Sequence, residues 1–135
     1  MSWSNITQVV SVLSLPASTN TDLDSDAIQP VRITDETGIA QMCFVTSAGG
    51  GSFKDPGTTT GTFYIQGKLH EDAPWSDVYV NGTRKEVDAA DVSAGVGLFT
   101  SVAITNVPML PSIRVHGEDI NPTASNVFLD VFIME

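Results

Sequence analysis

The feature that most constrains this fold is a strict alternation of apolar and polar residues within short runs. The run TFYIQGKL places Phe63 and Ile65 on one face of an extended chain, and Tyr64 and Gln66 on the other. Side chains of a β-strand point alternately to its two faces, so a period of two predicts strands with one buried face. The same period recurs in IRVH and VFLDVFIM near the C-terminus. We therefore predict antiparallel sheets that pack on a shared core.

Turn-forming residues divide the chain between these runs. Clusters of Gly, Pro, Asn, Asp and Ser separate segments that are rich in Val, Ile, Phe, Tyr and Thr, as expected for many short strands. About eight such strands indicate an all-β protein, an antiparallel β-sandwich of the jelly-roll type. The predicted strands are 6–13, 29–34, 39–46, 61–69, 76–81, 97–105, 111–117 and 126–134.

The segments between the strands are expected to be irregular. The polar stretch 14–30 and the glycine-rich stretch 47–61 are predicted loops. The best helical candidate is 84–95, which has room for one or two turns before Gly95. Asn81-Gly82 is the preferred pair for a two-residue type I′ turn, in which both residues have positive φ.

The stretch from Gly61 to Glu86 contains a His, several acids and a Trp, and two interpretations compete for it. It is either a reactive site or two strands around a polar loop, and we favour the second interpretation. Gly67 then marks a bulge or a close backbone approach within a strand. We expect Trp75 to cap the edge of the core and His70 to be solvated.

Length and hydropathy indicate one domain, residues 1–135, whose first 15 residues we expect to form a docking arm or an added strand. A chain of 135 residues with 41% hydrophobic residues can bury a substantial core. No apolar run approaches the roughly 20 residues of a membrane helix. The N-terminus MSWSNITQVV lacks the pattern of a signal peptide. No membrane contact is therefore expected.

Charge and cysteine content exclude several classes of function. Sixteen acidic against six basic residues give a net charge of −10, and such a surface repels phosphate backbones, so no nucleic-acid partner is expected. The single Cys43 excludes an intrachain disulfide and a zinc site made of thiolates. It lies in the apolar run IAQMCFV, where a buried thiol is expected.

Two His-containing clusters are candidates for a metal site, HED at 70–72 and HGED at 116–119. One His and one carboxylate from each would give a mixed nitrogen and oxygen coordination sphere. Neighbouring residues of a strand point to opposite faces, however, and nothing in the sequence brings the two clusters together. We expect solvated loops and no metal ligand here.

Calcium is a second metal to consider, because Asp22, Asp24 and Asp26 have the spacing of the first ligands of an EF-hand loop. Ala27 stands where that loop needs Gly, and Ile33 stands where it needs a bidentate Glu. A polar surface loop is the default interpretation, and a looser calcium loop remains the alternative.

Catalytic motifs are not found in the sequence. No G-x-S-x-G elbow is present, and Cys43 has no His near it in sequence. The glycines of 47–61 are not followed by the G-K-[ST] of a phosphate-binding loop. We predict that the chain is not an enzyme, and that it has no catalytic residue and no cofactor.

The order of elements in the second half resembles that of small virion proteins of tailed bacteriophages. The resemblance covers Gly61–Glu135 and lies in the succession TFYIQGKL, a loop with Trp75, DVYVNG, GLFTSVAIT, NVPMLPSIRVHG and NVFLDVFIME. Capsid decoration (cement) proteins and other head or tail accessory proteins belong to this group. The resemblance implies a structural role in the virion, as a homo-oligomer bound to the major capsid protein or to other virion subunits.

Apolar and aromatic residues outside the predicted core are the expected contacts of such a protein. Aromatic side chains are enriched at protein interfaces, but on a sheet face they also stack on sugars. Three alternatives therefore stay open, a carbohydrate-binding module, a calcium-binding module and a tail or neck accessory protein. The predicted interface residues are Trp3, Ile6, Val9, Val10, Val12, Phe53, Tyr64, Trp75, Tyr79, Phe128 and Phe132.

Overall fold

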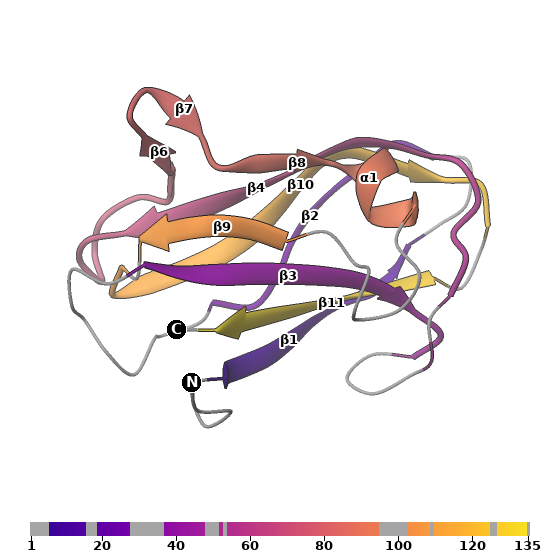
Figure 1. Ribbon diagram of the computed structural model, residues 1–135, viewed down its shortest axis with the longest axis horizontal. Helices are drawn as coiled ribbons and strands as arrows, with labels where there is room; N and C mark the ends of the chain where they lie inside the picture. Colours follow the sequence, from indigo (N-terminus) through magenta and orange to yellow (C-terminus); the bar gives the residue numbers. More distant parts are fainter. Residues whose placement is uncertain are drawn as a thin grey trace.

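The strands form two sheets that face each other across a common core (Figure 1). The computed structural model describes residues 6–15, 19–27, 37–47, 52, 54–94, 103–108, 110–124 and 127–134. For 6–15, 93–94, 103 and 132–134 it describes the backbone alone.

The first sheet, called sheet A here, contains both the first and the last strand of the chain. Its order is β1-β11-β3-β9, and all neighbours are antiparallel. In its centre Val131 pairs with Val10 on one side and with Met42 on the other. The bounds are β1 Ile6–Leu15, β11 Val127–Met134, β3 Thr37–Val45 and β9 Ala103–Pro108.

The second sheet, sheet B, has the order β2-β10-β4, followed by an edge position that β5 and β8 share. Its two long central strands pair in continuous register from Ser112↔Lys68 to Glu118↔Thr62. The bounds are β2 Thr21–Asp24, β10 Ser112–Pro122, β4 Thr59–Lys68, β5 Ser76–Asp77 and β8 Glu86–Asp88.

A small hairpin interrupts the shared edge position opposite Ile65. The Ile65 carbonyl accepts a hydrogen bond from the Val78 N–H, and the Ile65 N–H donates to the Lys85 carbonyl, both at 3.0 Å. Between these two contacts the chain leaves the sheet as β6 (Tyr79–Val80) and β7 (Thr83–Arg84). This hairpin projects from the body of the sandwich (Figure 1).

The strand order identifies the architecture as a jelly roll. The chain passes from sheet A to sheet B and back, and β5 and β8 together occupy one position. With that position counted once, the sheets contain strands 1-8-3-6 and 2-7-4-5 in chain order, which is the double Greek key of an eight-stranded jelly roll. The predicted fold class, an antiparallel β-sandwich of the jelly-roll type, is confirmed.

The core lies between the inner faces of the two sheets. Phe44 of sheet A meets Phe63 of sheet B with ring centroids 6.2 Å apart and ring planes at 55°, a tilted arrangement that aromatic pairs prefer. The short helix α1, Ala89–Ala94, adds Ala89 and Val92 to this core. Other fully buried core residues are Met42, Ile65, Val107, Ile113, Val115, Ile120, Val127, Leu129 and Val131.

Five of the predicted strands correspond to β1, β3, β4, β10 and β11 within a few residues at each end. The turn prediction is also confirmed, since Asn81 and Gly82 have φ values of 53° and 79° and connect β6 to β7. Their positive φ matches the right-handed twist of the flanking strands.

Other predictions need correction. Stretch 14–30 was predicted as a loop, but it includes β2, whose alternation is hidden because Asp22 and Asp24 flank a single buried Leu23. The predicted strand 76–81 is divided by the excursion at Val78, and part of the predicted helix 84–95 is strand β8. The predicted strand 29–34 lies outside the described residues, and so do residues 97–102 of the predicted strand 97–105. The rest of that predicted strand belongs to β9.

Candidate functional site at one end of the sandwich

The loop between β4 and β5, residues 69–75, is polar and exposed. The Ala73 N–H donates to the His70 carbonyl at 3.0 Å, and the Asp72 N–H donates to His70 Nδ1 at 3.1 Å. The side chains of His70 and Asp72 are mostly exposed. The local hydrogen bonds make a tight turn, and His70 is solvated as expected.

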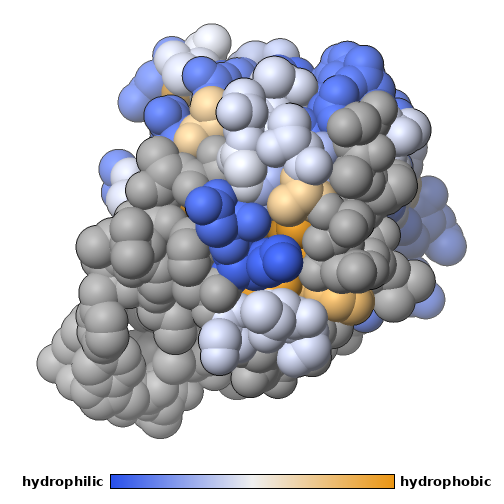
Figure 2. Space-filling view, turned by 90° about the vertical axis from the view of Figure 1, so that its right-hand side faces the viewer, coloured by the Kyte–Doolittle hydropathy of each residue, from blue (hydrophilic) through white to orange (hydrophobic). Residues whose placement is uncertain are grey.

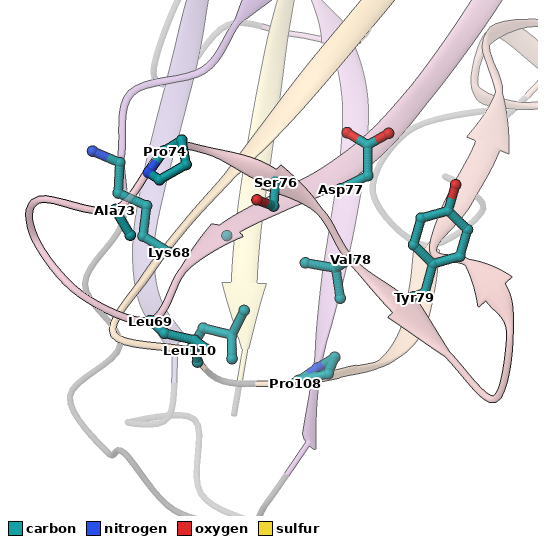
Figure 3. A pocket seen from close by; sticks show the side chains of 11 residues that line it. Lys68, Leu69, Ala73, Pro74, Ser76, Asp77, Val78, Tyr79, Pro108 and Leu110 are labelled. Atoms are coloured by element: carbon teal, nitrogen blue, oxygen red, sulfur yellow. The ribbon is translucent and has the colours of Figure 1, made fainter.

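Beside this loop the surface has an apolar hollow of about 350 Å³. Figure 3 shows Leu69, Leu110 and Pro108 on one side of Val78, with Tyr79 on the hairpin side. Leu69 is 77% exposed and Tyr79 is 59% exposed, and they are two of the three large exposed hydrophobic residues in the described part of the chain. The remaining lining residues are Gly67, Lys68, Ala73, Pro74, Ser76 and Asp77.

Gly67 also lines the hollow, and a larger residue there would require the flexible Leu110 side chain to move. A Cβ atom at this position would overlap the Cδ1 atom of Leu110. The strand pairing of Gly67 with Ile113 and with Ser76 is regular, so no bulge is present. The predicted close backbone approach is not found either, because the group next to Gly67 is the side chain of Leu110.

A second hollow, of about 400 Å³, lies on the outer side of the same loop. Trp75 lines it and is half-buried, with Lys68 Nζ 4.9 Å and Arg114 Cζ 4.3 Å from its ring centroid. Both distances are within the range of cation–π attraction. The other lining residues are Ala27, Glu71, Pro111 and Ser112.

A chain of polar contacts extends from Trp75 across the outer face of sheet B. Arg114 Nε donates to Gln66 Oε1 at 2.9 Å, and Gln66 Nε2 donates to Asp77 Oδ1 at 3.1 Å. Arg84 approaches Asp77 Oδ2 at 3.4 Å and Glu86 Oε1 at 2.8 Å. The hydrogen bond to Glu86 raises the pKa of Arg84 above its ordinary value, and Asp77 adds to this effect.

Tyr64 lies beneath this polar layer. The Arg84 guanidinium lies 4.0 Å from its ring centroid, and the His116 ring lies 5.0 Å away. The Tyr64 hydroxyl donates to Glu118 Oε2 at 3.2 Å. Burial, and then the hydrogen bond to Glu118, raise the pKa of Tyr64 to about 12.

Two of the three aspartates that suggested a calcium loop as an alternative, Asp22 and Asp24, have protein partners. Asp22 Oδ1 accepts the Asp119 N–H at 2.9 Å, while Asp24 Oδ1 contacts His116 Nδ1 at 2.5 Å and Arg114 at 3.5 Å. Within the described residues, no group of three or more His, Cys, Asp or Glu side chains is arranged to hold a metal ion.

The predicted interface residues lie in different environments, and several lie outside the described residues. Trp75 and Tyr79 line the two hollows, which share the 69–75 loop. Tyr64 was predicted to be an exposed aromatic, and this is wrong because it is only 6% exposed. Phe128 is half-buried. Trp3 and Phe53 lie outside the described residues, and for Ile6, Val9, Val10, Val12 and Phe132 only the backbone is described.

Sequence patterns did not reveal two features of the site. Leu69 is the last residue of the predicted strand 61–69, but β4 ends at Lys68 and Leu69 is exposed. Leu110 lies between Pro108 and Pro111, outside the predicted strands. Gly67 was the available clue, because a glycine inside a strand marks a place where another group comes close.

The comparisons with known proteins identify no relative. No protein-family model matches the chain, and no curated protein or solved structure matches it significantly. Among the described residues, no helix is long and apolar enough to span a membrane.

Proposed function

We propose that this chain is a structural virion protein, a decoration protein that binds the outer surface of a bacteriophage head as an oligomer. Its partner is the major capsid protein. The resemblance over Gly61–Glu135 supports this proposal, and so does the jelly-roll architecture, which occurs in viral capsid proteins as well as in lectins and cupins. Because one fold serves many functions, the proposal depends on the surface.

The observation that carries it is the apolar hollow with Leu69 and Tyr79 at its rim. The chain has a net charge of −10, and an apolar contact surface does not require a partner of opposite charge. Large exposed side chains next to a hollow are suited to anchor an interface. They can insert into a pocket of the partner, and the hollow can accept a side chain of the partner. Leu69 directly follows β4 and Tyr79 begins β6, and the hydrogen bonds of Ile65 and the pairing of β4 with β5 hold these segments in place.

The two ends of the sandwich differ in this respect. Figure 2 looks onto the end opposite the 69–75 loop, and hydrophilic and intermediate residues cover most of its coloured surface. Only a small strongly hydrophobic area is visible there, partly behind a hydrophilic group. The end with Leu69 and Tyr79 is therefore the better candidate for an anchor.

The test is co-sedimentation with phage heads that were assembled without this protein. Leu69→Ser and Tyr79→Ser should each weaken binding, by roughly tenfold or more if these residues are anchors. Ile39→Ser is the matched control, because Ile39 of β3 is the third large exposed hydrophobic residue of the described part. Undiminished binding by the double variant, or no binding by the unmodified protein, would contradict the proposal.

A second candidate function is carbohydrate binding at the Trp75 hollow. Trp75 offers an aromatic surface, while Lys68 and Ser112 offer hydrogen-bond donors beside it. A glycan-array signal that Trp75→Ala abolishes and Tyr79→Ala preserves would favour this function. Tail or neck attachment remains an alternative location for a structural protein, and electron microscopy of labelled virions distinguishes it from the head surface.

A further inference from the structure

The edges of the two sheets differ in how they are protected from other strands. An edge strand exposes a row of unpaired N–H and C=O groups that can pair with another chain. Sheet A has its edges at β1 and β9, and sheet B has its edges at β2 and at the position of β5 and β8. Contacts between β1 and β2 place these two edges on the same side of the sandwich.

Three of these edges carry features that prevent pairing. Strand β2 has only four residues, two of them acidic, and β8 has three residues, again with two acids. Strand β9 ends at Pro108, has Asn106 at a φ of 55°, and has a register shift in its pairing with β3. Short length, charge, proline and irregular backbone all discourage another strand from adding.

Strand β1 has none of these features over most of its length. Its ten residues, ITQVVSVLSL, include no charged residue, no proline and no glycine. The pairing with β11 is uninterrupted from Gln8↔Ile133 to Val12↔Leu129, so the backbone there is regular. In the described part of the chain, no strand pairs with the other edge of β1.

We infer that β1 is a self-association edge, at which two copies of this chain pair their β1 strands antiparallel about a two-fold axis. A strand that pairs antiparallel with its own copy satisfies two-fold symmetry and requires no second surface. Two copies that each carry a charge of −10 repel each other least where the facing segments are uncharged. Sheet A then continues across the axis into sheet A of the second copy.

Pairing through β1 would supply the oligomer contact that the proposed function requires. The role of the dimer on a phage head rests on that proposed function, but the pairing itself does not. Self-association is measured in solution without phage heads, so the two proposals can fail separately. A monomer that binds heads would overturn the β1 edge alone, while a β1 dimer that ignores heads would overturn decoration alone.

Sedimentation of the unmodified protein, with hydrogen exchange at low and high concentration, is the first test. We expect a dimer, and slower exchange at high concentration for alternate amides of 6–15. Alternate residues are expected because neighbouring residues of an antiparallel strand direct their N–H groups to opposite edges. A monomer at every concentration, or slower exchange elsewhere and not in 6–15, overturns the inference.

Val10→Pro and Ser11→Pro provide an internal control, since one of them removes an N–H that faces β11 and the other removes an N–H at the free edge. The free-edge variant should lose less stability than the other variant, because it keeps the hydrogen bonds to β11. Its dimerisation should weaken about 30-fold, because each dimer loses two backbone hydrogen bonds. Dimerisation that survives in the more stable of the two variants contradicts pairing through β1.

Discussion

The outer faces of the two sheets have opposite characters, although both sheets cover the same core. On sheet B the outward residues of β4 and β10, such as Gln66 and Arg114, pair with one another at the surface. On sheet A the outward residues Cys43, Val45 and Asp130 are all less than 5% exposed. The outer face of sheet B is thus mainly polar, whereas part of the outer face of sheet A forms a second buried layer.

The difference shows what alternation in a sequence means. In β10 the apolar Ile113 and Val115 are buried while Arg114 and His116 are half-buried, as expected for a sheet with one wet face. In β11 both sets of positions are largely apolar, as expected for a strand whose second face is also covered. Asp130 lies in that covered face directly opposite Cys43. Burial, and then the charge of Asp130, raise the pKa of the Cys43 thiol.

The largest expected effect comes from the core that both sheets share. Phe44→Ala removes the ring that packs against Phe63, and it should lower the free energy of unfolding by about 3–5 kcal/mol. Denaturant titration measures this loss. A loss below about 1 kcal/mol would mean that the two sheets do not depend on this contact.

Cys43→Ser tests the buried outer layer of sheet A. The new hydroxyl has to be desolvated beside Asp130, so we expect a loss of about 1–3 kcal/mol. Thr60→Ser, at an exposed position of β4, is the control and should change stability by less than about 0.5 kcal/mol. Equal effects of the two variants would show that the two outer faces do not differ.

Tyr64→Phe tests the polar layer of sheet B. It removes the hydrogen bond to Glu118 without removing the ring, and should cost about 1 kcal/mol in chemical denaturation. Arg84 and His116 keep their contacts with the ring in this variant. A loss above about 3 kcal/mol would indicate that the hydroxyl is as important as a core side chain.

The titration of Tyr64 gives an independent measurement at high pH. The folded pKa of about 12 lies above the ordinary value of 10.0, so the fold favours the protonated phenol. The contribution to stability is complete below pH 10 and is lost as the pH rises toward 12. The chain has two tyrosines, so in Tyr79→Phe the phenolate absorbance reports Tyr64 alone. A midpoint near 10 in the folded protein would contradict its burial.

The smallest expected effect concerns the ion pairs at the surface of sheet B. Arg84→Met keeps the side-chain stem but removes the contacts with Asp77 and Glu86, and should cost less than about 1 kcal/mol. The loss should shrink further at high salt because screening already weakens exposed pairs. A loss that is independent of salt would indicate that the main contribution is the packing of the guanidinium on the Tyr64 ring.

Local sequence patterns were sufficient to predict features that depend on a single strand or turn. Alternation located the inward residues of β4 and β10, and Asn81-Gly82 specified a two-residue turn by its need for positive φ. The prediction that Tyr64 is exposed was wrong because residues distant in sequence pack on its ring. These residues are Arg84 of β7 and His116 of β10. The candidate site was only half foreseen, since Trp75 and Tyr79 were named but the Leu69 and Leu110 hollow was not.

The sequence by itself determined the all-β class, because side-chain alternation and turn chemistry are properties of a few neighbouring residues. Only the tertiary structure decided which strands are neighbours, and therefore which strands are edges and which outward residues are buried. The reason is that strand order depends on pairs far apart in the chain, such as β1 with β11. The free energy of such pairings is shared between segments, and neither segment encodes it alone.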